Sequence, residues 1–316
     1  MAIGGDILSN ERKHKTNSNI LQVGLAEYLL LLDLGSQIFS VRELATKFDA
    51  SVGTISHLLQ ELESFGAVKI ERKGHLGSYL ESHSINVLWE IIETGPMVIA
   101  FTIPSNLRFE GLATGIKAAI RSKGIEIYII FIRGSSIRLK SLREGRCHAI
   151  VVSQLSADEE CSKDEEIIIS LPEGSWLREN RIFSRVGKLG KNQQLRVGVD
   201  PDSFDQNMIT KLAFDERQVE FVKTNFSQLP RLFKNGHIDA TTWNVEDERF
   251  SLLKDTISNP LPKRVQEIVS GRDISAAIVT RKANKIVKIM LKEAIDIDAI
   301  LEIQREVISG TYIPEY

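Results

Sequence analysis

Two serines that each begin a helix, followed by a glycine-containing hairpin, constrain the fold of this chain more than any other feature. Ser40 precedes Glu43 by the spacing of a capping box, in which each side chain accepts a hydrogen bond from the other residue's backbone amide. The helix that Ser40 begins should run to about Phe48. Ser51 should cap a second helix, and Gly66 should end it in a left-handed conformation. The pattern predicts two short helices joined by a tight turn.

The second of these helices has one apolar face. That face consists of Ile55, Leu58, Leu59, Leu62 and Phe65, which recur at the spacing of a buried stripe. The outward face is then formed by Gly53, Thr54, Ser56, His57, Gln60 and Glu61.

A helix and a hairpin complete this N-terminal segment. Residues 21–34 form an apolar helix that Gly35 ends, and residues 68–80 alternate as strand, glycine-containing turn and strand. Three helices with a hairpin make a winged helix-turn-helix, whose second motif helix fits the major groove of double-stranded DNA. The alternative is a small helical domain that serves dimerisation or protein contact.

The candidate DNA contacts lie on the outward helix face and in the hairpin. Thr54, Ser56 and His57 would reach base edges, and Lys73, His75 and Ser78 would touch the backbone or the minor groove. His57 could equally pair with Glu61 one turn on. The full set that we expect to contact DNA is Arg42, Ser51, Thr54, Ser56, His57, Lys73, His75 and Ser78.

Charge neither favours nor excludes this role. The chain has a net charge of −2. Residues 1–84 hold eight Lys and Arg against ten Asp and Glu, which gives the head 8 − 10 = −2 as well. Non-specific affinity for DNA rests on phosphate neutralisation, which this balance does not supply overall. Positive charge is nevertheless clustered, in Arg12–Lys15 and near the hairpin turn.

The head resembles the DNA-binding domain of GntR-type bacterial regulators over residues 39–80. The matching positions are Ser40, Arg42, Glu43, Leu44, Ala45, Ser51, Thr54, Leu59, Leu62, Glu63, Gly66, Gly74, Gly77, Ser78 and Tyr79. The resemblance implies that Arg42 contacts the DNA backbone. Val52 and Ser56 stand where the family has arginines that read the operator, which implies an unusual operator or weaker binding.

After a helical connector over 85–94, the pattern changes to alternating strands and helices. Strands are expected over 97–101 and 127–132, with a helix over about 107–122 between them. Such alternation favours an α/β fold with a parallel sheet that helices cover on both sides.

Two segments of this body echo one another at an offset of 91 residues, which suggests two similar lobes. In each, an apolar strand leads to a helix with a serine, Ser136 or Ser227, placed to cap it. A glycine, Gly145 or Gly236, ends each helix before a returning strand.

The end of the chain adds a strand over 276–279 and helices over about 285–294 and 299–309. A chain that builds one lobe, crosses to a second and returns resembles the type 2 periplasmic-binding-protein fold. We expect a winged helix-turn-helix domain over 1–84 and a two-lobed α/β domain over 85–316. The first lobe would span about 95–155 and 275–316, and the second about 165–270.

The whole layout resembles the YhfZ family of bacterial transcription regulators. The segments that carry this resemblance are Arg133-Gly134-Ser135, Gly198 to Ser203 and Ile313 to Tyr316. The resemblance implies the two-part architecture and leaves the effector open.

Ligands of a two-lobed fold lie at the carboxyl ends of strands and the amino ends of helices. The candidate ligand contacts are Thr102, Ser105, Arg133, Ser135, Ser136, Ser153, Asp200, Ser203, Thr224 and Asn244, with Asn106, Asn225 and Trp243 beside them. Helix amino termini and the guanidinium of Arg133 favour an anion. Asp200 and Asp202 could select an amine, so a zwitterion stays open. Each serine could instead be a helix cap, and the basic residues at 138, 140, 143 and 146 are interpreted as a solvated face.

These patterns lead to a DNA-binding transcription regulator whose cleft senses a small anionic metabolite. We expect a cytoplasmic homodimer without a cofactor, a metal or a membrane partner. The first residues lack the apolar core of a signal peptide, and Cys147 and Cys161 lie at no metal-ligand spacing. The alternatives are a ligand-free dimerisation body and, since other proteins of this fold are enzymes, an enzyme with a regulatory domain. No set of catalytic residues is evident.

Overall fold

The computed structural model describes residues 17–93, 95–188, 194–247, 249 and 255–316. The chain folds into two compact units. The first ends at Met97 and adds Ile120–Tyr128 and Asn284–Ala294, and the second comprises Val98–Ala119, Ile129–Ala283 and Ile295–Tyr316. Among the described helices, none is both long and apolar enough to cross a membrane.

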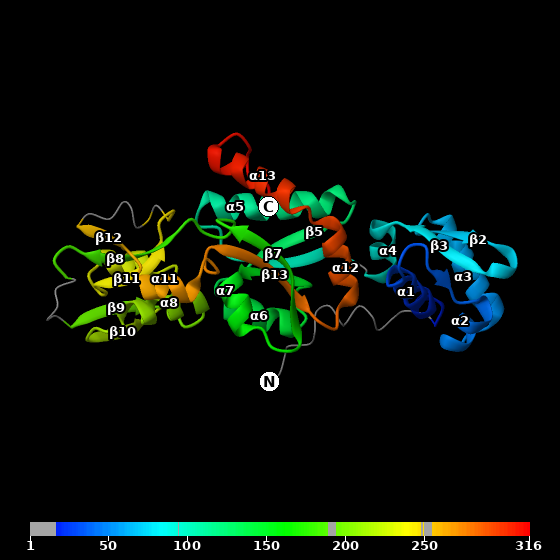
Figure 1. Ribbon diagram of the computed structural model, residues 1–316, viewed down its shortest axis with the longest axis horizontal. Coiled ribbons are helices and arrows are strands. Elements are labelled where there is room, and N and C mark those ends of the chain that lie inside the picture. Colours follow the sequence, from blue (N-terminus) through cyan, green and yellow to red (C-terminus); the bar gives the residue numbers. More distant parts are fainter. Residues whose placement is uncertain (1–16, 94, 189–193, 248, 250–254) are drawn as a thin grey trace. The chain divides into compact units, whose positions relative to one another are not determined.

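The N-terminal head consists of helices and a small antiparallel sheet of order β1-β3-β2 (Figure 1). Its elements are α1 (Asn17–Leu30), β1 (Gln37–Ile38), α2 (Val41–Lys47), α3 (Val52–Ser64), β2 (Val68–Arg72), a 3-10 turn over Gly74–Leu76, β3 (Ser78–His83) and α4 (Ile85–Ile92). This is the winged helix-turn-helix that the sequence predicts, with α2 and α3 as the motif helices and β2–β3 as the wing.

The local signals that define the motif are confirmed. Ser40 and Glu43 form the capping box, with hydrogen bonds of 3.3 and 2.7 Å to each other's side chains. Ser51 accepts a hydrogen bond from the amide of Thr54 at 3.0 Å. The stripe of α3 is buried as far as Leu62, but Phe65 is 56% exposed, so its predicted place in the core is wrong. Phe65 is the C-cap residue, where the chain turns away from the helix axis.

The first helix ends four residues earlier than the expected range, at Leu30 rather than 34. Gly35 donates to the carbonyl of Leu80, and Leu80 donates to that of Ser36. Because these bonds extend the pairing of β1 with β3, the chain must leave the helix before Gly35 to reach the sheet.

The body contains two five-stranded sheets whose strands are arranged in an equivalent order. The first, β5-β4-β6-β13-β7, belongs to lobe 1, and the second, β10-β9-β11-β8-β12, to lobe 2. Lobe 1 has β4 (Met97–Phe101), α5 (Leu107–Ser122), β5 (Ile127–Phe131), α6 (Ser135–Arg143), β6 (Ala149–Ser153), α7 (Gln154–Glu160), β7 (Glu165–Glu173), β13 (Ser275–Arg281), α12 (Lys285–Ala294) and α13 (Ile297–Ser309). Lobe 2 has β8 (Asn180–Arg185), β9 (Leu195–Val199), α8 (Phe204–Phe214), β10 (Val219–Lys223), α9 (Leu229–Lys234), β11 (Ala240–Asn244), β12 (Thr256–Pro260) and α11 (Lys263–Val269).

The two sheets also match in strand direction. β4 pairs parallel with β6, as β9 does with β11, and in each sheet an antiparallel strand, β13 or β8, comes next. The echo at an offset of 91 residues corresponds to β5-α6-β6 and β10-α9-β11. Gly145 and Gly236 follow their helices with φ of 70° and 72°, as predicted. β5 proves to be an edge strand, so Tyr128 is exposed and the strand is not buried throughout.

The predicted serine caps of the two echoing helices are wrong. α6 begins one residue before Ser136, with Gly134 at its N-cap, and the Ser136 hydroxyl donates to Glu160 instead. α9 begins at Leu229 with Gln228 as its N-cap, and Ser227 donates to Asn225 Oδ1 at 2.6 Å. In both segments the serine bonds a neighbouring side chain rather than the helix amides.

Candidate functional site

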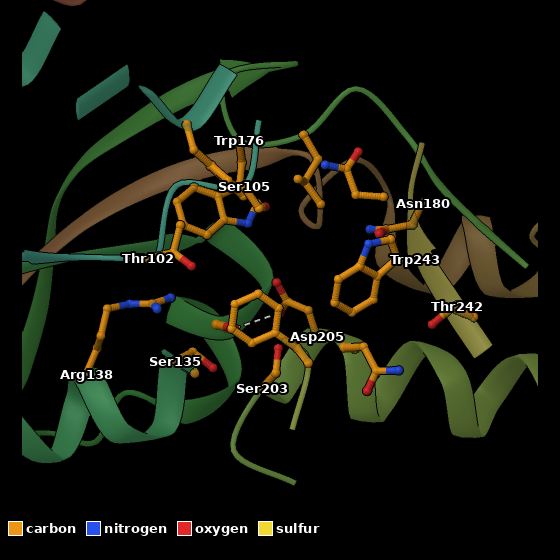
Figure 2. A pocket seen from close by; sticks show the side chains of 17 residues that line it. Thr102, Ser105, Ser135, Arg138, Trp176, Asn180, Ser203, Asp205, Thr242 and Trp243 are labelled. Carbon is orange, nitrogen blue, oxygen red and sulfur yellow. Dashed lines mark hydrogen bonds between the residues drawn. The ribbon is translucent and has the colours of Figure 1, made fainter. Parts of the chain in front are cut away.

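A pocket of about 100 Å³ lies where the carboxyl ends of the body's strands meet the amino ends of its helices (Figure 2). Lobe 1 contributes the turn after β4, the first turns of α6 and α7, and the loop after β7. Lobe 2 contributes the beginnings of β8 and α8, the loop after β10 and the end of β11. Its lining residues are Thr102, Ser105, Phe109, Gly134, Ser135, Arg138, Ser156, Trp176, Leu177, Asn180, Ser203, Asp205, Gln206, Phe226, Thr242, Trp243 and Asn244.

Five of the ten candidate ligand contacts line this pocket. They are Thr102, Ser105, Ser135, Ser203 and Asn244. The neighbouring Trp243 lines it as well. That these side chains contact a ligand stays a prediction.

The candidate Arg133 does not line the pocket and is held by carboxylates. Its Nη1 lies 3.3 Å from Asp200 Oδ2, and its Nη2 donates to Asp202. Asp200 is fully buried and also accepts from the amides of Asp202 and Phe226, at 3.0 and 2.7 Å. These contacts link the end of β5 to the end of β9, and the single positive charge of Arg133 is already matched by two carboxylates.

The other candidates lie around the pocket without lining it. Ser153 is buried and caps α7 by accepting from the amide of Ser156 at 2.9 Å. Ser136 bonds Glu160, as described above. Thr224 is half-buried at the end of β10, 3.5 Å from Gln228 Oε1.

Hydrogen bonds join the lobes beside the pocket. Phe204 N donates to Ser135 Oγ at 3.2 Å, and Ser156 Oγ donates to Asp205 Oδ1 at 2.7 Å. At Gly134, φ is +70°, and an added Cβ would lie 2.4 Å from the carbonyl oxygen of Asp202. A glycine is therefore required here both by the left-handed backbone and by the close approach of the other lobe.

Arg138 is the group that most distinguishes the pocket. It is only 3% exposed, and its interpretation as part of a solvated face is wrong. Nη1 donates to the carbonyl of Ile132 at 2.9 Å, and the guanidinium carbon lies 5.9 Å from the ring centre of Trp176. Nε is buried without a hydrogen-bond partner, and no nitrogen of this side chain forms an ion pair within 4.0 Å with a carboxylate of the described residues.

Burial lowers the pKa of Arg138 from 12.5 to about 10, against the opposing influence of Asp205 and Glu160. A guanidinium with that pKa is charged at neutral pH. The charge of Arg138 is buried without an ion pair, and Asp205 and Glu160 do not offset the cost of its burial, so a bound anion would stabilise it. Figure 2 shows the side chain reaching from α6 toward the space between Thr102 and Asp205.

Asn244 contributes a second unused donor from the opposite lobe. Its side chain is 8% exposed, and its Oδ1 accepts from the amide of Glu246 at 3.0 Å. That bond fixes the orientation of the amide, and Nδ2 is then buried without a partner. Two donors without acceptors thus line one pocket, one from each lobe.

One carboxylate also lines the pocket. Burial raises the pKa of Asp205 to about 6, although hydrogen bonds from Ser153 and Ser156 lower it. Asp205 is therefore mostly ionised at neutral pH. The apolar walls come from aromatic rings: Trp176 packs edge-on against Phe109 at 4.7 Å between ring centres, and Trp243 stacks on Phe226 at 5.8 Å.

In the head, some candidate DNA contacts are exposed, and others are paired with neighbouring side chains. Arg42, Ser51 and His57 are exposed, and Thr54 and Ser56 are half-buried on α3. His57 Nδ1 lies 3.5 Å from Glu61 Oε2, which is the pairing that the sequence left as an alternative.

In the wing, the basic side chains are paired. Lys73 Nζ lies 3.0 Å from Glu71 Oε2 and above the ring of Tyr79. Lys69 and Arg72 pair with glutamates in the same way, while His75 is exposed and Ser78 half-buried.

Comparison with known proteins identifies the family. Residues 84–316 match the family model described as YhfZ C-terminal domain, and residues 33–80 match one described as helix-turn-helix domain. The chain belongs to the YhfZ family. It is 31% identical over 296 residues to the uncharacterized protein YhfZ of Escherichia coli strain K12, which covers 92% of this chain and 95% of that protein.

A solved structure of a YhfZ protein agrees with the family. The crystal structure of YhfZ from Shigella flexneri is similar at a TM-score of 0.58 and 29% identity, over 70% of this chain and 93% of that one. An ABC-transporter periplasmic substrate-binding protein from Coxiella burnetii matches at a TM-score of 0.44 and 12% identity, over 69% of this chain and all of that one. The fold is an N-terminal winged helix-turn-helix with a two-lobed α/β body, in which each lobe contains one five-stranded sheet.

Arg138, Asp205 and Trp176 are site residues that the sequence interpretation missed. Arg138 lies one turn before Leu142 on α6, on the face that packs into the body, whereas Lys140 falls on the solvent side. Helical periodicity alone would have placed it inside.

Proposed function

We propose that this protein is a cytoplasmic, homodimeric transcription regulator that binds operator DNA through the head and senses a small anionic metabolite in the body. The observation that carries the sensing role is Arg138, a buried guanidinium with no carboxylate partner among the described residues, in a pocket between two lobes. The helix-turn-helix match and the exposed face of α3 support the DNA-binding role.

Each group would have a defined part. Arg138 Nε and Asn244 Nδ2 would bind the acceptor atoms of the anion, with Thr102 and Ser203 as further hydroxyl donors. In the head, Thr54 and Ser56 would reach base edges, and Arg42 would contact a phosphate. As in dimeric helix-turn-helix proteins, the two heads would occupy half-sites about one helical turn apart.

Coupling follows if the anion favours one arrangement of the lobes. A ligand held by donors on both lobes binds their closed arrangement more tightly than an open one, and only such a difference can shift an equilibrium. Coupling free energies of roughly 1–3 kcal/mol, or about 5–150-fold in affinity, are typical of allosteric proteins.

The DNA-binding role is tested with the full chain and duplexes selected from a random library. Fluorescence anisotropy of the enriched duplex should show the double variant Arg42→Ala/Thr54→Ala binding at least about 10-fold more weakly than the wild type. Arg121→Ala, at an exposed position of α5, is the control and should bind normally. No enrichment of any duplex, or unchanged binding by the double variant, contradicts the proposed DNA surface.

The sensing role is tested with a library of small carboxylates and phosphates. A compound that raises the melting temperature should also change the affinity for the enriched duplex, and Arg138→Gln should abolish both effects. Arg146→Gln, an exposed arginine that pairs with Glu144, should retain them. A compound that acts equally on wild type and Arg138→Gln would place the sensing site elsewhere.

A further inference from the structure

Arg138 is not the only charged side chain that lines the pocket. Asp205, at the first turn of α8, lines it as well and receives the hydroxyl of Ser156 at 2.7 Å. Arg138 and Asp205 are the charged side chains among the lining residues, so the lining carries one positive and one negative charge.

This balance discriminates between ligands. A purely anionic ligand would gain from Arg138, but Asp205 would repel it in a space from which most water is excluded. A simple amine would gain from Asp205 and meet the buried guanidinium. A molecule with both a carboxylate and an ammonium group satisfies both residues, because opposite charges in a low-dielectric site interact more strongly than in water.

The remaining walls of the pocket indicate the chemistry of the rest of the ligand. Trp176 of lobe 1 and Trp243 of lobe 2 are 5% and 7% exposed and present indole rings to the pocket (Figure 2). Phe109, Leu177 and Phe226 extend the apolar lining. A cavity of about 100 Å³ holds a single small molecule and no peptide chain.

We propose that the pocket binds an α-amino acid or a closely related amino carboxylate with an apolar side chain. Arg138 and Asn244 Nδ2 bind the carboxylate, Asp205 binds the ammonium group, and the side chain lies against the two tryptophans. This inference rests on the proposed sensing function and narrows the anion of that proposal to a zwitterion. Asp205 is then the residue that decides specificity.

The test is direct binding to the full chain, without DNA. The twenty common L-amino acids, succinate and inorganic phosphate are screened by thermal shift. Each amino acid that binds is titrated calorimetrically beside its desamino acid and its decarboxylated amine, for example L-phenylalanine beside 3-phenylpropanoate and phenethylamine. We expect at least one apolar amino acid to bind at least 10-fold more tightly than both of its relatives.

Variants assign the two charges separately. Asp205→Asn keeps the shape and an acceptor for Ser156. It should weaken binding of the amino acid at least 10-fold, and it should strengthen binding of the desamino acid, because the carboxylate that repels an anion is gone. Arg138→Gln should weaken both. Asp158→Asn, the same change at a carboxylate of α7 that does not line the pocket and pairs with Arg272, should leave every affinity unchanged.

The outcomes separate this inference from the broader one. If succinate or phosphate binds through Arg138 and no amino acid does, the zwitterion is wrong and the anion sensor stands. If the desamino acid binds as tightly as the amino acid, or Asp205→Asn leaves their ratio unchanged, the role of Asp205 is wrong. If none of these compounds binds, the zwitterion assignment fails, while the DNA and library experiments above decide the proposed function independently.

Discussion

Replacing Arg138 with methionine should stabilise the ligand-free protein. Burial lowers the pKa of Arg138 from 12.5 to about 10 at a site that is 3% exposed, which corresponds to about 3 kcal/mol against the charged form. Because the folded pKa lies below the unfolded one, this cost is fully present at pH 7 and is relieved only above about pH 10. Methionine has a similar length, no charge and a sulfur that suits the neighbouring ring of Trp176.

The substitution also loses one hydrogen bond, from Nη1 to the carbonyl of Ile132, worth about 1 kcal/mol net. The balance is a gain of about 2 kcal/mol, or about 4–8 °C in melting temperature for a unit of this size. Urea unfolding followed by tryptophan fluorescence measures it, since two of the three tryptophans line the pocket.

Arg143→Met is the matched control, on the same helix, and should lower stability, because it leaves the carboxylate of Glu165 without its guanidinium. A destabilisation of more than about 1 kcal/mol by Arg138→Met would refute the reasoning, since it would mean that the guanidinium has a compensating partner in the ligand-free protein.

Three further predictions concern other residues. Gly134→Ala should destabilise the body by about 1–3 kcal/mol more than Gly174→Ala in thermal unfolding, because both glycines have positive φ but only Gly134 has a backbone oxygen of the other lobe in the way. Hydrogen bonds from Arg143, and secondarily from Ser162, lower the pKa of Glu165 to about 2, so stability should fall by about 1–3 kcal/mol as the pH drops from about 4.5 toward 2. Arg143→Met should reduce that dependence in acid unfolding curves. Ser51→Ala should lower the free energy of unfolding of the head by about 1 kcal/mol, because it removes the N-cap of α3. Thermal unfolding followed by circular dichroism measures this, and an unchanged stability would mean that the cap does not stabilise α3.

The local architecture of the head could be predicted because its signals lie within a few residues of each other. The capping box of Ser40 and Glu43 and the cap by Ser51 depend on spacing alone and formed as expected. The end of the first helix could not be predicted in the same way. It depends on the pairing of Gly35 and Ser36 with Leu80, a residue more than 40 positions away in the sequence.

The same division holds for the pocket. Strand ends pointed to Thr102, Ser203 and Asn244, which do line it, because the carboxyl ends of strands in an α/β sheet gather at one edge. Arg133 pointed to an anion for a sound chemical reason, but its partner Asp200 comes 67 residues later and from the other lobe. Spacing within the sequence gives no access to such a pairing.

Arg138 connects stability to signalling. A buried guanidinium without an anion destabilises the ligand-free body. Natural selection would replace this arginine unless a bound molecule offset the loss of stability. The molecule would bind Arg138 of lobe 1 together with Asn244 and Asp205 of lobe 2, so every contact that it gains requires the two lobes to be close. Its binding free energy therefore acts on the arrangement of the lobes, which is the differential affinity that a change in a distant DNA-binding head requires. Arg138→Met would therefore leave a more stable protein that lacks the donor for the ligand, so that no anion could bias the arrangement of the lobes.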